Sequence, residues 1–113
     1  MTLLKVRINV RMDHGWLKKW VKTRREIIKQ LLGENPEIKV FNAGRGYYVE
    51  IKVSKQLPDH NLNMLQLLLG DDHIRVKRNR LLISNKIQNW NDFRLDQPMP
   101  THVKRAMSHF HIN

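Results

Sequence analysis

The sequence predicts an α+β fold of the ferredoxin-like type, a βαββαβ sandwich with one open sheet face. Three segments alternate apolar and polar residues with a period of two, which is typical of half-buried strands. Two further segments carry apolar residues at helical spacing, one after the first strand and one after the third. This order of elements, completed by a last strand, places two helices on one face of the sheet and leaves the other face open.

The first strand is expected over residues 3–11, where β-branched residues alternate with polar ones. Its apolar positions are Leu4, Val6, Ile8 and Val10, and its polar positions are Lys5, Arg7, Asn9 and Arg11. Because successive side chains of a strand point to opposite faces, we expect the apolar set to face the helices and the polar set to face the open side.

A long helix is expected next, with Asp13 as its N-cap and Gly33 at its end. One arc of this helix is apolar and contains Trp16, Leu17, Trp20, Val21, Ile27, Ile28, Leu31 and Leu32. A basic stripe lies beside the arc and consists of Lys18, Lys22, Arg25 and Lys29. Arg24 projects into the apolar arc, where we expect it to snorkel to the surface or to pair with a carboxylate.

A hairpin is expected after Pro36, with strands over residues 37–42 and 46–54. The turn Ala43-Gly44-Arg45-Gly46 joins them, because glycine adopts backbone angles that are closed to other residues. The inward positions are Ile38, Val40, Tyr47, Val49, Ile51 and Val53, and the outward ones are Lys39, Phe41, Tyr48, Glu50, Lys52 and Ser54.

The second helix is expected to begin at Pro58-Asp59, to carry Leu62, Leu65, Leu68 and Leu69, and to end at Gly70. Asp71-Asp72 can cap a further helix through about Arg80. The last strand is expected either at Leu81–Ile83 or around Trp90–Leu95, and we favour the second position. Residues 1–96 would then form the domain and residues 97–113 a C-terminal tail, which can hold a short helix over 101–109.

The composition restricts the function. The chain has 113 residues, with 21 Lys plus Arg against 10 Asp plus Glu and a net charge of +11, which indicates one domain with a polyanionic partner. The absence of Cys excludes disulfide scaffolds, thiol catalysis and Cys-based metal sites. No apolar run is long enough to span a membrane and no signal-peptide pattern is present, so we expect an intracellular, cytoplasmic protein without cofactor, metal or membrane partner.

The open face is the predicted binding site for nucleic acid, preferably single-stranded. Aromatic side chains on a sheet can stack on bases, while Lys and Arg attract phosphates. The candidate residues are Lys5, Arg7, Arg11, Lys39, Phe41, Gly44, Arg45, Gly46, Tyr48 and Lys52. Glu50 is an acidic residue on the same face and can neutralise Lys52 or Arg7. Two alternatives remain open: a homodimer or a terminal segment can cover the same face, and the basic stripe of the first helix can bind a duplex or be an ordinary solvated surface.

Residues 41–49, Phe-Asn-Ala-Gly-Arg-Gly-Tyr-Tyr-Val, resemble the Ser-Gly-Arg-Gly-Tyr-His segment in the small subunit of archaeal primases, of the archaeo-eukaryotic primase superfamily. Small proteins of archaea and of their viruses and plasmids carry a similar segment followed by Leu-Leu-Gly-Asp-Asp, which is similar to residues 68–72 here. The resemblance implies an RRM-like sheet and a viral or mobile-element origin. It also implies nucleotide binding near Tyr48, the position of the primase His.

The primase resemblance does not extend to catalysis, because the expected strands carry no Asp-x-Asp pair to hold divalent cations. Arg45-Gly46-Tyr47 also begins like the signature of the RNA-recognition motif, but Tyr47 and Tyr48 are adjacent and must point to opposite faces. His109-Phe110-His111 has the spacing of a metal-binding pair in replication nucleases, without a tyrosine after it. We therefore expect a non-catalytic nucleic-acid-binding protein. The alternatives are a homodimeric interaction protein and a metal-dependent replication nuclease or primase-like enzyme.

Overall fold

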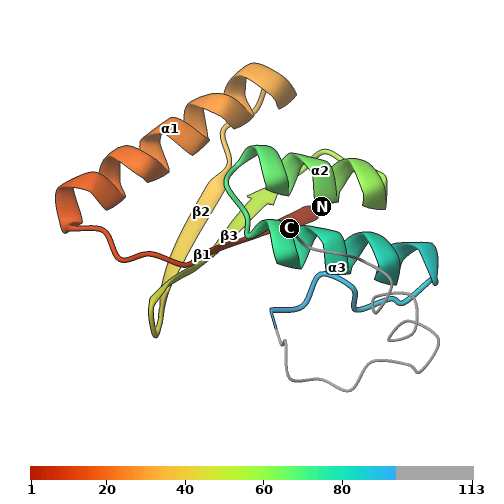
Figure 1. Ribbon diagram of the computed structural model, residues 1–113. Coiled ribbons are helices and arrows are strands. Elements are labelled where there is room, and N and C mark those ends of the chain that lie inside the picture. Colours follow the sequence, from red (N-terminus) through yellow and green to blue (C-terminus); the bar gives the residue numbers. More distant parts are fainter. Residues whose placement is uncertain (94–113) are drawn as a thin grey trace.

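The computed structural model describes residues 1–93 as one three-stranded antiparallel sheet with three helices (Figure 1). The elements are β1 (Thr2–Ile8), α1 (His14–Leu32), β2 (Glu37–Ala43), β3 (Gly46–Val53), α2 (Asp59–Leu68) and α3 (His73–Ser84). The strand order is β1-β3-β2, so β3 is central and β1 and β2 are the edges. The α+β class is confirmed, and the first five elements have the order of a ferredoxin-like fold.

The sixth element, α3, is the further helix expected after Asp72, but it continues past Arg80 to Ser84, and no fourth strand occurs within residues 1–93. Leu81–Ile83 lies inside α3. This segment is helical because Asp72 caps it through the amide of Ile74, and because its buried positions recur at helical rather than strand spacing. Trp90 lies in a turn and packs into the core. Residues 94 and 95, and the tail with its expected helix over 101–109, lie outside the described residues.

The core forms between the sheet and the helices on one of its faces. Its inward strand positions are buried at Leu4, Val6, Ile8, Tyr47, Val49, Ile51 and Val53, as the alternation predicts. Strand β1 ends at Ile8, however, before the predicted Val10 and Arg11. Val10 is 62% exposed, because it follows the end of the ladder with β3 and therefore no longer has a fixed inward direction.

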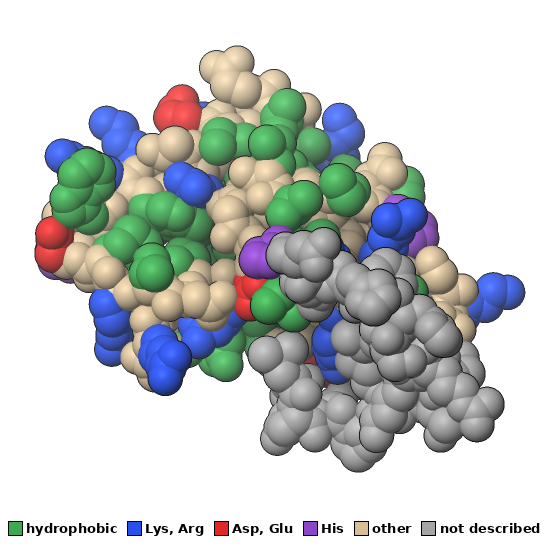
Figure 2. Space-filling model, viewed as in Figure 1, with side chains coloured by type: hydrophobic (Ala, Val, Ile, Leu, Met, Phe, Trp, Pro, Cys, Tyr) green, Lys and Arg blue, Asp and Glu red, His purple; other side chains and the backbone are tan. Residues whose placement is uncertain are grey.

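The helix layer leaves much apolar surface uncovered. Helix α1 has the predicted caps: the Asp13 carboxylate accepts from the Trp16 amide, and Gly33 is left-handed with φ +70°. Only Ile28 of its apolar arc is fully buried, whereas Trp16 is 62% exposed. The exposed large apolar residues of the three helices are Trp16, Leu31, Met64, Leu67, Leu68 and Ile74. Figure 2, viewed as Figure 1, shows hydrophobic side chains gathered over α1 and α2.

Arg24 is held by a backbone carbonyl and an aromatic ring rather than by the carboxylate that we considered. Its Nε donates to the Leu69 carbonyl at 2.9 Å, and its guanidinium lies 4.4 Å from the ring centre of Trp20. Partial burial lowers the pKa of Arg24 below its ordinary value. The arginine thereby connects α1 to the end of α2 across the apolar layer. None of the helices within residues 1–93 is long and apolar enough to cross a membrane.

Candidate nucleic-acid interface on the open sheet face

The face opposite the helices has two chemically different ends. Strand pairing puts Lys5 beside Glu50, Arg7 beside Tyr48 and Phe41 beside the same Tyr48. We call the part formed by Leu3, Glu37, Lys39, Glu50 and Lys52 the carboxylate end. We call the part formed by Arg7, Phe41, Arg45 and Tyr48 the hairpin end, because it adjoins the β2–β3 turn.

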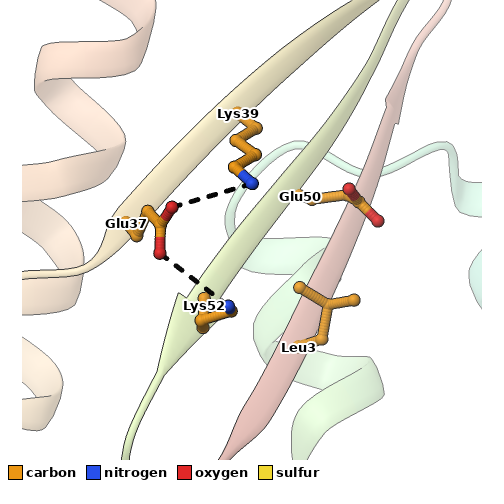
Figure 3. A pocket seen from close by; sticks show the side chains of 5 residues that line it. All are labelled: Leu3, Glu37, Lys39, Glu50 and Lys52. Atoms are coloured by element: carbon orange, nitrogen blue, oxygen red, sulfur yellow. Dashed lines mark ion pairs between the residues drawn. The ribbon is translucent and has the colours of Figure 1, made fainter.

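The carboxylate end is a hollow of about 200 Å³ in which positive and negative charges balance (Figure 3). Glu37 lies 3.8 Å from the ammonium of Lys39 and 3.9 Å from that of Lys52. Glu50 points into the same hollow, and Lys52 pairs with Glu37 instead of with Glu50. Two of the predicted cations therefore have acidic neighbours, which weakens their attraction for phosphate.

The hairpin end brings together aromatic rings and guanidinium groups. Phe41 is 46% exposed. The Arg7 guanidinium lies 4.7 Å from the ring centre of Tyr48 and donates to the carbonyls of Ile8, Tyr47 and Ala43. Since its donors are bound to backbone carbonyls, Arg7 orients the Tyr48 ring and braces the hairpin more than it offers a phosphate contact.

The segment after α3 covers part of the predicted site. The Phe93 ring stacks on Tyr48 with ring centres 4.5 Å apart and an interplanar angle of 27°. The Lys5 ammonium lies 5.4 Å from the centre of the same ring and pairs with Asp92 at 3.6 Å, and the Lys5 side chain is 18% exposed. Tyr48 and Lys5 thus lie on the expected face, but this chain already occupies one side of Tyr48. Phe93 was not among the predicted site residues, because nothing local to its sequence indicates that it returns to the sheet.

The turn of the hairpin combines one strained and one crowded glycine. Gly44 has φ +48° and open space around it, and Arg45 beside it is exposed. Gly46 is buried, and a Cβ built on it would lie 1.8 Å from the Ile8 carbonyl oxygen. The turn therefore offers one exposed guanidinium group, that of Arg45.

Arg11 does not lie on the open face as predicted, because β1 ends at Ile8 and the strand alternation does not continue to residue 11. It donates to the side-chain oxygen of Asn42 at 2.9 Å, and its guanidinium lies 5.2 Å from the ring centre of Tyr47. Asn42 and Tyr47 pair with each other at inward strand positions, so Arg11 lies on the helix side of the hairpin.

The basic stripe of α1 forms a separate surface. Arg25 donates to the Pro36 carbonyl at 2.8 Å, and Lys29 pairs with Glu26 at 3.6 Å. Lys18 and Lys22 are exposed on the same helix face. The contact from Arg25 shows that this face is turned toward the start of β2.

A polar network along the outer edge of β1 is the main feature that the sequence analysis missed. The Lys5 amide donates to Gln66 Oε1 at 2.8 Å, and the Arg7 amide donates to Asp71 Oδ1 at 2.7 Å. The carbonyl of Arg7 accepts from the Asp72 amide at 3.1 Å, and that of Lys5 accepts from Arg75 at 3.3 Å. A fourth strand of a ferredoxin-like sheet would lie along this edge, and here side chains replace it.

Asp71 and Arg75 form the buried centre of this network. Arg75 Nη1 lies 2.7 Å from Asp71 Oδ2, and both side chains are almost inaccessible. Burial raises the pKa of Asp71, and the Arg75 charge and two backbone amides oppose that rise. Asn91 completes the network: it exchanges amide hydrogen bonds with Gln66 and accepts from Arg75. The only sequence signal was polar residues on buried helix faces, notably Asn63 and Gln66 beside Leu62 and Leu69.

The Leu-Leu-Gly-Asp-Asp stretch therefore has a structural role in this chain. Leu69 is in the core, Asp71 satisfies the β1 edge, and Asp72 caps α3. Leu68, which we expected on the apolar face of α2, is 60% exposed, because Asn63 and Gln66 occupy the buried face instead. Within residues 1–93 no group of three or more His, Asp or Glu side chains is arranged to hold a metal ion. The His109-Phe110-His111 pair lies outside the described residues.

Comparison with known protein families, with curated proteins and with solved structures finds no match for this chain.

Proposed function

We propose that the protein binds single-stranded nucleic acid at the hairpin end of its sheet and has no chemistry of its own. The observation that carries the proposal is the exposed ring of Phe41, at 46%, beside the Tyr48–Phe93 stack. Phe41 offers one face to a base, and the stack behind it forms a rigid aromatic wall. Arg45, exposed in the turn, provides the phosphate contact.

Charge favours the hairpin end over the carboxylate end. The stretch from Phe41 to Tyr48 contains no acidic residue, whereas Glu37 and Glu50 lie in the hollow at the other end. A phosphate backbone that passes over the sheet meets less repulsion beside the turn. The proposal narrows the predicted site to Arg7, Phe41, Arg45 and Tyr48, and it treats the sheet as an RRM-like platform. It agrees with the primase-like resemblance of residues 41–49, which implies nucleotide binding at Tyr48, and with a viral or mobile-element origin.

The test is fluorescence anisotropy with a labelled single strand of about 20 nucleotides, longer than the footprint of comparable sheet surfaces. Phe41→Ala is expected to weaken binding about tenfold, because one base–aromatic stack contributes roughly 1–3 kcal/mol. Phe41 is a better target than Tyr48, since truncation of Tyr48 also removes the support of Phe93 and Arg7. The affinity of the wild type is expected to fall steeply between about 50 and 300 mM salt.

Lys52→Ala is the matched control, because Lys52 lies on the same face but pairs with Glu37. It is expected to change the affinity less than twofold, since an exposed ion pair contributes little. If Lys52→Ala weakens binding and Phe41→Ala does not, the attraction is a general effect of charge and the hairpin end is not the site. Binding that is indifferent to Phe41 but lost in Lys18→Glu/Lys22→Glu would place the nucleic acid on α1.

The homodimer alternative predicts a different result. A salt-insensitive dimer in light scattering that Phe41→Ala dissociates, together with no nucleic-acid binding at low salt, would show that the hairpin end is a protein interface. Cleavage of nucleic acid or nucleotidyl transfer that depends on a divalent metal would instead show that the protein is an enzyme.

A further inference from the structure

The two edge strands of the sheet differ in whether their outward backbone groups are hydrogen-bonded. Along β1, backbone groups that point away from β3 are bound by Gln66, Asp71, Asp72 and Arg75. Such cover is how proteins prevent an edge strand from pairing with another chain. The other edge, β2, is the contrasting case.

The register identifies the outward groups of β2. The backbone amides and carbonyls of Lys5 and Arg7 point away from β3. In an antiparallel pair, the backbone groups of their partners Glu50 and Tyr48 therefore point away from β1 and toward β2. Their β2 partners, Lys39 and Phe41, then face β3, and the alternate residues Ile38, Val40 and Asn42 direct their amides and carbonyls outward. Within residues 1–93 none of these six outward backbone groups has a hydrogen-bond partner.

The surroundings of this edge are basic. The face of α1 that carries Lys18, Lys22, Arg25 and Lys29 is turned toward β2, as the hydrogen bond from Arg25 to Pro36 shows. Figures 1 and 3 both show α1 on the β2 side of the sheet. A second copy of this chain would bring a second basic stripe against the first, which is unfavourable. An acidic strand would meet complementary charge.

We propose that the outer edge of β2 accepts an extended acidic peptide segment of a partner protein, which adds a strand beside Ile38, Val40 and Asn42. The added strand would form backbone hydrogen bonds with these three residues, as in β-strand addition to other open sheets. Acidic side chains on its helix side would approach the α1 stripe. This site is distinct from the hairpin end and does not depend on nucleic-acid binding.

The first experiment uses two labelled octapeptides, one alternating Val and Glu and the other alternating Val and Lys, in fluorescence anisotropy. The Val/Glu peptide is expected to bind and the Val/Lys peptide is not. N-methylation of the Val/Glu peptide is expected to abolish binding, because a methylated amide cannot donate to a strand edge. Hydrogen exchange is expected to slow at the amides of Ile38, Val40 and Asn42 when the peptide binds, and to remain unchanged at Lys39 and Phe41.

The matched protein variants are Val40→Pro and Val40→Thr. Proline removes one outward donor and is tolerated where a strand amide faces solvent, whereas threonine keeps the donor and the shape. Val40→Pro is expected to weaken the peptide at least about tenfold and Val40→Thr less than about twofold. Circular dichroism checks that both fold, and the N-methylated peptide tests the edge without any change in the protein.

Three outcomes would overturn the proposal. The first is no binding of the Val/Glu peptide at millimolar concentration. The second is binding that survives both N-methylation and Val40→Pro, since a charge-driven contact would not need the edge. The third is slow exchange at Ile38, Val40 and Asn42 that depends on protein concentration without peptide, which would assign the edge to a second copy. None of these results bears on the anisotropy test with single-stranded nucleic acid.

Discussion

At Gly46 the β2–β3 hairpin packs tightly against the end of β1. A Cβ at this position would lie 1.8 Å from the carbonyl oxygen of Ile8 and 2.8 Å from its carbonyl carbon. Both atoms belong to the backbone, so no side-chain rotation can relieve the overlap. Gly46, a candidate nucleic-acid-binding residue in the primase-like segment 41–49, is therefore required here for packing.

Gly46→Ala is expected to lower the free energy of unfolding by about 3 kcal/mol, because overpacking against backbone forces β1 away from β3. Gly44→Ala is the control: Gly44 has φ +48° but nothing within 4 Å, so only the left-handed backbone disfavours the alanine, by about 1 kcal/mol. Urea unfolding of both variants measures the difference. Equal losses would mean that the hairpin moves away from Ile8 without cost.

Asp71 and Asp72 show how neighbouring identical residues acquire different roles. Asp72 is at the surface and caps α3 through the amide of Ile74. Asp71 is buried, pairs with Arg75 and accepts from the amide of Arg7. The sequence indicated capping for both, because the helix start is a local signal, whereas the β1 edge is 64 residues away along the chain.

At the scale of elements, this pair holds α3 beside the sheet. Asp71→Asn is expected to destabilise the protein by about 3–5 kcal/mol, because it leaves the Arg75 guanidinium buried without an anion. Asp72→Asn removes the same charge but keeps a good N-cap, so a change below about 0.5 kcal/mol is expected. Thermal unfolding by circular dichroism compares the two variants. A similar loss for both would show that the buried pair adds nothing beyond helix capping.

Strands and helices differ in how well local pattern defined them. The period of two located β1, β2 and β3 to within three residues, and Asp13 and Gly33 located α1. The predicted last strand is not found within the described residues. Its sequence signal was ambiguous, since Leu81–Ile83 is apolar and short enough for a strand or for part of a helix. Long-range contacts determined this part of the fold. Asn63, Gln66 and Arg75 are polar but buried, because they form hydrogen bonds with Asn91 and with backbone groups.

At the scale of the whole molecule, Glu34 connects the end of α1 to the end of β3. Its carboxylate accepts from the amide and hydroxyl of Ser54 at 2.7 and 2.9 Å and from the amide of Lys55 at 3.2 Å. The amide of Ser54 is the main cause that lowers the pKa of Glu34 below its ordinary value. A lowered pKa means that the folded state favours the ionised form.

The stabilisation from Glu34 is therefore present above its unfolded pKa and is lost as the pH falls through its folded pKa. The melting temperatures of the wild type and Glu34→Gln are expected to differ at about pH 7 and to converge as the pH falls toward about 3. The comparison isolates Glu34 from Asp71, whose raised pKa acts in the opposite direction in both proteins. A difference that stays constant over this range would show that Glu34 does not titrate with folding.

The sequence by itself determined the α+β class, the two faces of each strand, the helix caps and the basic, aromatic character of the hairpin. These follow from periodicity and from residues that act on their near neighbours. Only the tertiary structure decided that Phe93 covers Tyr48, that Glu37 pairs with Lys52, and that polar groups close β1 while β2 stays open within residues 1–93. The reason is that each of these contacts joins segments that are far apart in the sequence, and a local residue pattern does not show which distant segments meet.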